Sequence, residues 1–397
     1  MRPKLELNSI FGQNMYKRIL ENHLRELART FPIVSVTGPR QSGKTTLCRM
    51  AFDGYDYVNL EDEESRSVMQ QDIKGFLRSH ASGLIIDEAH YLPEVFSALQ
   101  VVCDEDDSRR YILSGSSNWL MMQNISQSLA GRVALVRLLP LSIAELGAAD
   151  AISTDRLLYW GFYPAVWGKG RPPFAVYDGY FSTYVQRDVR QMVNIRDMNL
   201  FRKFIRLCAT RVGCEFVAST LASEVGVSLK TVQGWLNVLE ASYVVFLLQP
   251  YYRNVGKRIT KTPKLYFCDT GLACYLLGYK SELDVANSPL RGALFENMVV
   301  ADMLKRRYNA GLESNLYFYR DKSQREVDLL MEEAGRLHAF EIKSATVFHE
   351  SFFSTLNYLR TLYGDDVEMA QVIYDGEHES ASPIGGFANY RHILDKI

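Results

Sequence analysis

A run of glycine, small polar and basic residues near the amino end of the chain has the types and spacing that suit phosphate. The run precedes Thr46 and reads Gly38-Pro39-Arg40-Gln41-Ser42-Gly43-Lys44-Thr45. The apolar residues 33–37 before it predict a strand, and the apolar-periodic residues after it predict a helix. In that setting glycines let backbone N–H groups close around phosphate oxygens, and the amino end of the helix adds its positive dipole.

Two side chains of this loop would complete the phosphate site. Lys44 would reach the β- and γ-phosphates of a nucleotide, and the Thr45 hydroxyl would be a ligand of Mg²⁺. A chance glycine turn before a helix is the alternative, which the strand and helix on either side disfavour. We therefore predict an ATP site in which residues 38–46 all take part.

A second pattern adds two carboxylates. Residues 83–88 form an apolar run, typical of a buried central strand, that ends in Asp87 and Glu88. At a strand end Asp87 can hold Mg²⁺ through water, and Glu88 can polarise the water that attacks the γ-phosphate. An ordinary turn explains the pair equally well when it is taken alone. With the loop, both sets must meet at the strand ends of one sheet, which favours an ATP-hydrolysing site.

Three further apolar runs, at 57–60, 111–114 and 133–136, predict the remaining strands of this sheet. The first lies between the loop and the Asp-Glu pair, and this order resembles the additional-strand class of P-loop ATPases. Ser116 or Asn118 could sense the γ-phosphate, although both are also ordinary turn residues. Arg132 could contact the γ-phosphate in cis or from a neighbouring subunit, but a surface arginine after a turn is an equal alternative.

The first 150 residues resemble the AAA-type ATPases of bacteria and archaea that carry a C-terminal domain of uncharacterised function. The resemblance rests on residues 37–45, 59–62, 86–88, 113–117, 129–132 and 139–142, in that order. It implies an ATPase core and strengthens the role of Arg132. The family usually has glutamine where this chain has His90, so we expect an exposed helix residue there rather than a phosphate sensor.

Bulk properties narrow the class of protein. A chain of 397 residues predicts two to four domains. The net charge of −1 excludes a globally basic nucleic-acid binder, but it leaves room for a local basic patch. Six cysteines without a C-x-x-C pair fit a reducing compartment, and no apolar run reaches membrane-spanning length. We therefore expect a cytoplasmic protein with no membrane partner.

The middle of the chain predicts two helical units. Residues 151–200 have helical periodicity. The family resemblance implies that residues 184–188 belong to a helical lid over the nucleotide. An amphipathic helix with a purely structural role is the alternative. Residues 201–285 predict a winged helix-turn-helix, with a short helix at 220–224, a glycine turn and a second helix at 229–240. That second helix should bury an apolar stripe that consists of Leu229, Val232, Leu236 and Leu239. Its exposed face should carry Lys230, Thr231, Gln233 and Asn237.

A basic stripe lies in the hairpin that would be the wing. No acidic residue occurs from 249 to 267, and the stripe consists of Arg253, Lys257, Arg258, Lys261 and Lys264. Phosphate contact is its natural use, which predicts DNA or RNA as a partner. Docking of a protein, or contact between subunits, is the alternative for a winged helix.

The last part of the chain, residues 286–397, carries a second set of chemical groups. Glu341 and Lys343 stand two apart on a predicted strand and so share one face, Asp328 lies on the preceding strand, and Glu296 lies on a helix. Two or three carboxylates around a lysine could hold Mg²⁺ or Mn²⁺, with Asp328 and Glu341 as its ligands, and cleave a phosphodiester. The set resembles the PD-(D/E)xK nuclease superfamily, in which many proteins bind without cutting. An ion-paired sheet edge is the alternative.

Together these patterns predict an α/β protein. A P-loop sheet of the additional-strand (AAA+) class at 1–150 is followed by a helical lid, a winged helix and a small α/β nuclease-like domain. The leading hypothesis is an AAA-type ATPase, coupled to nucleic-acid binding or metal-dependent DNA cleavage, that could form a homo-oligomer. The alternative is a signalling or assembly switch whose C-terminal domains dock a protein and have no nuclease activity.

Overall fold

A parallel sheet of five strands forms the first part of the chain in the computed structural model. The structure describes residues 16–115, 129–147, 149–168, 170–185, 197–252, 262–382 and 385–393. The strands are β1 (Ile33–Thr37), β2 (Asp56–Asn59), β3 (Leu84–Asp87), β4 (Tyr111–Ser114) and β5 (Val133–Arg137). They stand in the order β2-β3-β4-β1-β5, so β4 separates the loop strand β1 from β3. This confirms the predicted fold class, although β2, which precedes β3 in sequence, lies at the edge of the sheet.

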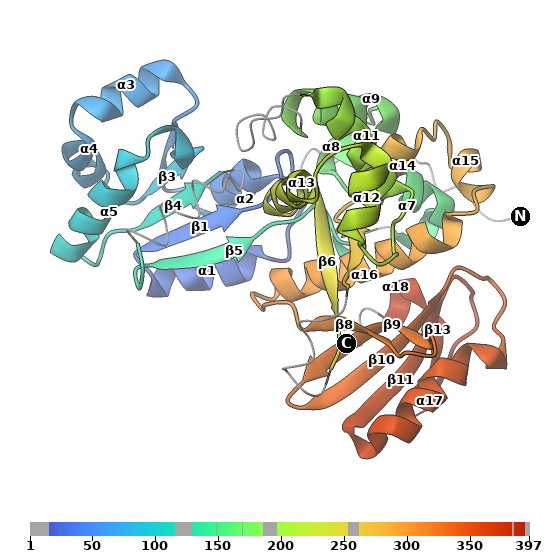
Figure 1. The fold of residues 1–397 in the computed structure, drawn as a ribbon. Coiled ribbons are helices and arrows are strands. Elements are labelled where there is room, and N and C mark those ends of the chain that lie inside the picture. Colours follow the sequence, from blue (N-terminus) through green and yellow to red (C-terminus); the bar gives the residue numbers. More distant parts are fainter. Residues whose placement is uncertain are drawn as a thin grey trace, which may run out of the picture.

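Helices cover both faces of this sheet (Figure 1). They are α1 (Glu21–Thr30), α2 (Lys44–Ala51), α3 (Glu63–Gln71), α4 (Ile73–Ser79) and α5 (Glu94–Glu105). Successive residues of a strand point to opposite faces, so the two faces build separate cores. Leu84 and Ile86 pack in the core that contains α5, whereas Ile85 packs with Val34 and Val36 in the core that contains α1 and α2.

Helices dominate the middle of the chain. They are α7 (Thr154–Trp160), α8 (Pro164–Gly168), α9 (Pro173–Tyr180), a π-helical turn (Phe181–Val185), α11 (Met198–Ala209), α12 (Ala218–Val225) and α13 (Leu229–Ala241). Gly226 ends α12 in a left-handed conformation, and the Ser228 side chain caps α13 by accepting from the Thr231 N–H. The antiparallel strands β6 (Val245–Pro250) and β7 (Lys264–Phe267) follow. The order of helix, turn, helix and strand pair is the one that the sequence predicts for residues 201–285.

The last part of the chain is a mixed sheet with one long helix beside it. Helices α14 (Thr270–Leu277), α15 (Glu282–Ala286) and α16 (Arg291–Asn309) lead into it. The sheet then adds β8 (Leu316–Arg320), β9 (Glu326–Glu333), β10 (Arg336–Lys343), β11 (Val367–Tyr374), β12 (Ser380–Ser382) and β13 (Gly385–Asn389), with helices α17 (Ser354–Tyr363) and α18 (Tyr390–Ile393). Figure 1 shows β6 running from the helical part down to this sheet.

The C-terminal sheet and the β6–β7 pair are continuous. Strand β6 pairs in parallel with β8 through Gln249 and Tyr317, so the eight strands run β12-β13-β11-β10-β9-β8-β6-β7. One hydrophobic core contains side chains drawn from between Leu139 and Tyr390 in the sequence, among them side chains of the helices of the middle part. The boundaries expected at 200 and 285 stay predictions, and side chains from both sides of each boundary pack in this one core.

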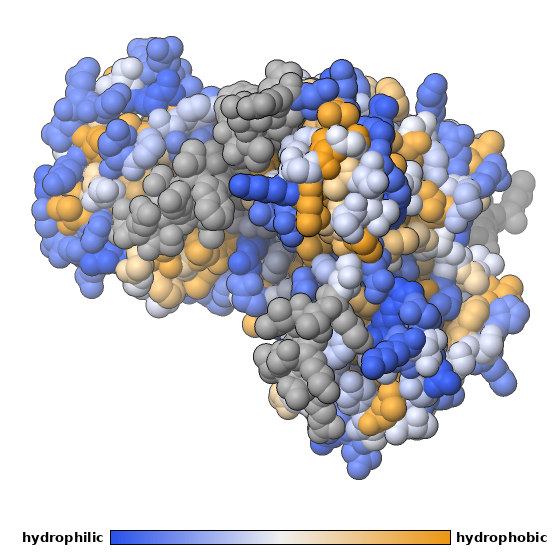
Figure 2. Space-filling model, in the orientation of Figure 1, coloured by the Kyte–Doolittle hydropathy of each residue, from blue (hydrophilic) through white to orange (hydrophobic). Residues whose placement is uncertain are grey.

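Figure 2 shows polar residues interspersed with hydrophobic ones over one face of the molecule. Over α3, α4 and α5 hydrophilic residues predominate, and hydrophobic ones are scattered among them. Within the described ranges, none of the helices combines the length and the apolar character that a bilayer crossing needs.

Candidate functional site

The glycine-rich loop connects the buried strand β1 to α2, as its position in the sequence predicts. Gly38 and Gly43 have φ angles of 150° and 95°, and α2 begins directly at Lys44. A Cβ on Gly38 would come 2.1 Å from the Leu138 carbonyl oxygen, so only glycine fits there. Gln41 also has a positive φ, 62°, which an L-residue adopts at some cost. The backbone is thus held in the tight curve that turns N–H groups toward a bound anion.

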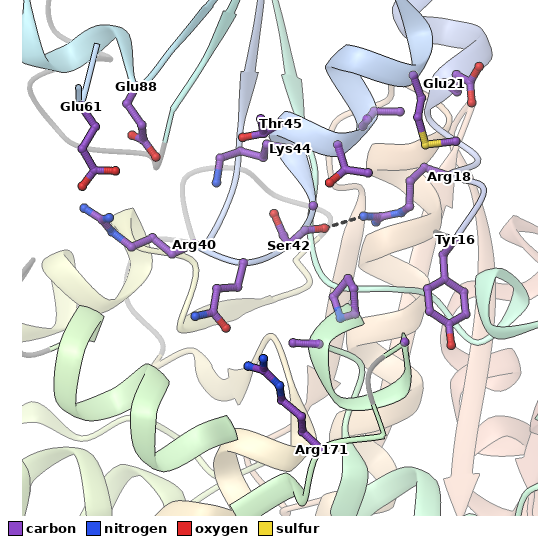
Figure 3. Close-up of a pocket in the computed structure, with 18 of the residues that line it drawn as sticks. Tyr16, Arg18, Glu21, Arg40, Ser42, Lys44, Thr45, Glu61, Glu88 and Arg171 are labelled. Carbon is purple, nitrogen blue, oxygen red and sulfur yellow. Dashed lines mark hydrogen bonds between the residues drawn. The ribbon is translucent and has the colours of Figure 1, made fainter. Parts of the chain in front are cut away.

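A cavity of about 790 Å³ opens beside this loop (Figure 3). Its walls come from the loop, from the residues before and within α1, from the ends of β2 and β3, and from the segment around α8. Arg40 extends from the loop toward the space between Glu61 and Glu88, and Arg171 points at the loop from the opposite side (Figure 3). Sequence reasoning missed Arg18 and Arg171, because no motif marks them, and it gave Glu61 no role at the site although residues 59–62 belong to the family resemblance.

Lys44 is buried beneath the loop. Its Nζ donates to the carbonyl oxygens of Gly38 at 2.9 Å and Pro39 at 2.8 Å. Burial lowers the pKa of Lys44 to about 8, although the charges of Glu88 and Asp87 act in the opposite direction. The loop carbonyls therefore hold a costly buried charge that phosphate oxygens would compensate better.

Thr45 and Asp87 meet at the carboxyl edge of the sheet. Thr45 Oγ1 donates to Asp87 Oδ2 at 2.8 Å, and the Tyr57 hydroxyl donates to the same oxygen at 2.9 Å. Asp87 is 5% exposed. A hydroxyl and a carboxylate in contact are the oxygen donors that Mg²⁺ accepts, together with water and phosphate oxygens. These two side chains thus fit the predicted metal position.

Glu88 follows Asp87 in a left-handed conformation, with φ 50°. Burial alone would raise its pKa, but a hydrogen bond from His90 and the positive charges of Lys44 and Arg40 outweigh it and lower the pKa to about 2. Its carboxylate is therefore ionised at neutral pH and can accept a proton or orient water. His90 Nδ1 lies 3.2 Å from Glu88 Oε2, and the His90 side chain is only 10% exposed. The expectation of an exposed residue at His90 was wrong.

The other nucleotide contacts expected from the sequence do not gather at the cavity. Ser116 and Asn118 lie outside the described residues. Arg132 lies at the amino end of β5, where its carbonyl accepts from the Ile33 N–H, and its guanidinium pairs with Asp104 at 2.5 Å. The five residues of β1, at about 3.3 Å each, separate that end from the loop by about 16 Å. The structure therefore does not bring Arg132 to the loop in cis, and contact from a neighbouring subunit stays a prediction.

The predicted nucleic-acid face is only partly described. Residues 186–188 of the expected lid lie outside the described ranges, and so do Arg253, Lys257, Arg258 and Lys261 of the basic stripe. On α13 the side chains of Lys230, Gln233 and Asn237 are exposed and Thr231 is half-buried. Leu229 is 48% exposed, so its place in the buried stripe was wrong; Trp235 is buried there with Val232, Leu236 and Leu239.

Lys264, the last residue of the basic stripe, is a buried side chain rather than a surface one. It is 2% exposed, and its Nζ lies 3.1 Å from Glu296 Oε1 and 2.5 Å from Glu326 Oε1. The ammonium group is already paired with these two carboxylates, so the expectation of a phosphate contact at this residue was wrong. Its negative partners come from α16 and β9, far away in the sequence.

The structure brings Asp328, Glu341 and Lys343 together on the C-terminal sheet. Lys343 Nζ lies 2.6 Å from Glu341 Oε1 and 3.6 Å from Asp328 Oδ2. The Ile342 N–H donates to Asp328 Oδ2, and Thr355 Oγ1 donates to Glu341 Oε2, at 2.7 Å and 2.8 Å. The predicted face of β9 and β10 therefore carries a compact ionic cluster.

Glu296 faces the same cluster from α16. The Tyr266 hydroxyl donates to its Oε1 at 2.5 Å, beside Lys264. Burial and the charge of Asp328 raise the pKa of both Glu296 and Glu341 to about 7. Within the described ranges, no three His, Cys, Asp or Glu side chains are grouped to hold a metal ion. Asp328 and Glu341 are nevertheless a pair of carboxylates of the kind that Mg²⁺ can use with water as its remaining ligands.

Three family models match successive parts of the chain. The one described as AAA domain matches residues 30–147. Two described as domains of unknown function, DUF8612 and DUF4143, match residues 152–283 and 291–388. The first part is therefore an AAA-type P-loop ATPase domain, and the descriptions of the other two state no activity.

Similar proteins cover most of the chain. The uncharacterized protein Rv2008c of Mycobacterium tuberculosis is 34% identical over 365 residues, which are 89% of this chain and 79% of that protein. The uncharacterized protein MJ1544 of Methanocaldococcus jannaschii is 22% identical over 75% of this chain and 71% of its own. Among solved structures, a Walker-type ATPase of Pyrococcus abyssi matches 70% of this chain and 98% of its own, with 14% identity and a TM-score of 0.43.

Proposed function

This chain belongs to the same family as the uncharacterized protein Rv2008c of Mycobacterium tuberculosis, and we propose that it hydrolyses ATP with the help of Mg²⁺. One observation carries the proposal. Thr45 Oγ1 lies 2.8 Å from Asp87 Oδ2, beside the cavity that Lys44 and the ionised Glu88 line. A phosphate loop, two metal-compatible oxygens and a proton acceptor thus stand at one edge of one sheet, as ATP hydrolysis requires.

Each group has a definite role in this proposal. The loop N–H groups and Lys44 bind and orient the phosphates, and Thr45 and Asp87 hold the metal ion. When bound, Mg²⁺ neutralises charge on the phosphate oxygens. Glu88 orients the attacking water and accepts its proton at the carboxylate. Arg40 and Arg171 face the cavity from opposite sides and supply positive charge where the γ-phosphate becomes more negative.

Lys44→Ala tests this assignment. The steady-state rate of ATP hydrolysis should fall by about 10²-fold or more, because the variant loses a charge-assisted donor to the phosphates. The rate is measured as phosphate release with Mg²⁺ and with EDTA. The matched control is Lys74→Ala, which removes a lysine of the same domain that does not line the cavity. Normal hydrolysis by Lys44→Ala, or none by the wild type in any condition, would refute the assignment.

The ionic cluster on β9 and β10 favours a second function, metal-dependent cleavage of nucleic acid. The observation that supports it is the contact of Lys343 with both Asp328 and Glu341. Nucleic acid would reach the protein through the exposed polar side chains of α13. Docking of a protein partner on the same surfaces is the competing proposal.

Two measurements separate these proposals. Retention of branched, single-stranded or duplex DNA, or of RNA, should weaken steeply with salt if phosphates are bound. With Mg²⁺ or Mn²⁺, cleavage should be lost in Asp328→Ala and Lys343→Ala, but not in Glu333→Gln, which changes an exposed carboxylate of the same strand. Absence of cleavage and of salt-dependent retention in the wild type would favour the protein-docking switch.

A further inference from the structure

Arg18 is a buried arginine directly behind the phosphate loop, and no motif predicts it. It is 5% exposed. Its Nη1 donates to the Ser42 carbonyl at 2.7 Å, its Nη2 to the Leu139 carbonyl at 2.8 Å, and its Nε to Glu145 Oε1 at 3.0 Å. Figure 3 shows the contact with Ser42 on the side of the loop away from Glu88. One planar guanidinium thus connects the loop to the segment that follows β5.

The charge of Arg18 is compensated inside the protein. The Glu145 side chain is 0% exposed and also accepts from the Ile19 N–H at 2.8 Å and the Ser142 N–H at 2.9 Å. A buried ion pair persists when further hydrogen bonds satisfy both partners, and removal of one partner leaves an unpaired buried charge. Arg18 and Glu145 therefore form a fixed unit rather than a surface pair.

The contact with Ser42 matters for the loop because of the direction of its backbone. A phosphate loop turns N–H groups inward, so some of its carbonyl groups must find donors elsewhere. Lys44 satisfies the carbonyls of Gly38 and Pro39. Arg18 does the same for Ser42, the residue before Gly43, and its Nη1 lies within 3.7 Å of where a Cβ of Gly43 would stand.

The segment after β5 that Arg18 contacts is also held by other side chains. Asp302 Oδ1 accepts from the Ile143 N–H at 2.7 Å, and Lys305 Nζ donates to the Leu141 carbonyl at 3.0 Å. Both side chains come from α16, the helix that also carries Glu296. The segment from Leu139 to Glu145 is thus held by Arg18 on one side and by α16 on the other.

We propose that Arg18, paired with Glu145, is a positioning residue that keeps the phosphate loop in its ATP-binding conformation. Although it also lines the cavity, its Nε, Nη1 and Nη2 each donate to a protein oxygen, so it acts through the orientation of the loop N–H groups. The proposal rests on the proposed ATPase function. It also gives the loop a defined attachment to α16 and to the C-terminal half of the chain.

The test compares Arg18→Gln, Arg18→Lys and Glu145→Gln with the wild type. Binding of a fluorescent ATP analogue and the KM and kcat for ATP are measured well below the melting temperature of each variant. Arg18→Gln should raise the Kd and KM for the nucleotide at least tenfold, and Arg18→Lys should recover part of the loss because lysine keeps the charge. Glu145→Gln should shift both constants in the same direction. Arg78→Gln, which breaks an exposed arginine–glutamate pair, should leave them unchanged.

The outcomes separate the positioning role from a structural one. A structural role lowers the melting temperature but leaves the Kd of the folded variant unchanged. A Kd within twofold of the wild type in folded Arg18→Gln overturns the proposal. If Arg18→Gln does not fold, the Kd of folded Glu145→Gln is used instead, and a value within twofold of the wild type overturns the proposal. If the wild type itself binds no ATP, the proposed ATPase function fails instead.

Discussion

Replacement of Glu88 by glutamine should leave ATP binding nearly unchanged and lower its hydrolysis by about 10²- to 10⁴-fold. Glutamine has the shape of glutamate but cannot take a proton from water. The carboxylate lies at the end of β3, beside the cavity, and its pKa of about 2 keeps it ionised at any pH where the protein is assayed. Loss of the negative charge near Lys44 should not weaken the contacts of the loop with phosphate.

The measurement pairs single-turnover hydrolysis with the Kd of a nucleotide analogue. His90→Gln is the matched control, since it removes the 3.2 Å contact with Glu88 but keeps the carboxylate. It should change the hydrolysis rate far less than Glu88→Gln does. Hydrolysis by Glu88→Gln within tenfold of the wild-type rate would contradict the role of Glu88 as proton acceptor.

The nucleotide site shows which residues a sequence can predict. The loop and the Asp87-Glu88 pair follow from local patterns, because each lies directly beside a buried strand. Arg18 and Arg171 reach the cavity from other parts of the chain, and no local pattern marks them. The place of Arg132 followed from topology alone: a residue that precedes a parallel strand lies at the edge opposite the loop. The strand order alone therefore predicts that Arg132 does not contact the phosphate loop of its own chain.

His90 shows a different limit. The family resemblance identified the position as unusual, but the type of residue could not reveal what faces it. The left-handed turn at Glu88 brings the imidazole back toward the carboxylate, and the His90 side chain is then only 10% exposed. A backbone conformation that few non-glycine residues adopt has no clear signal in a single sequence.

The C-terminal cluster was predictable where strand periodicity applied. Glu341 and Lys343 share a face because side chains alternate along β10, and Asp328 meets them from β9. Lys264 was misassigned for the opposite reason. Its neighbours in sequence lack acidic residues, so it resembled a surface cation, whereas Glu296 and Glu326 lie 32 and 62 positions further along the chain.

Replacement of Lys264 by methionine should destabilise the folded protein by about 3–5 kcal/mol at pH 8, because it leaves the largely buried Glu296 without its counter-ion and leaves Glu326 with Arg320 alone. The loss should be smaller at pH 6. Burial and Asp328 already hold the pKa of Glu296 at about 7, above its ordinary value, and removal of Lys264 raises it further. A carboxyl group with a raised pKa stabilises the fold while it is protonated, and that contribution is lost as the pH rises through the folded-state pKa.

Chemical denaturation at pH 6 and pH 8 measures both effects. The double variant Lys264→Met/Glu296→Gln should recover part of the stability at pH 8, because the neutral amide needs no counter-ion and its oxygen can still accept from Tyr266. Lys230→Met, which removes an exposed lysine of α13, should leave stability unchanged at both pH values. If Lys264 instead contacted phosphate, its replacement would weaken nucleic-acid retention and spare stability. That result would contradict the structural role, since the two functions of this one ammonium group exclude each other.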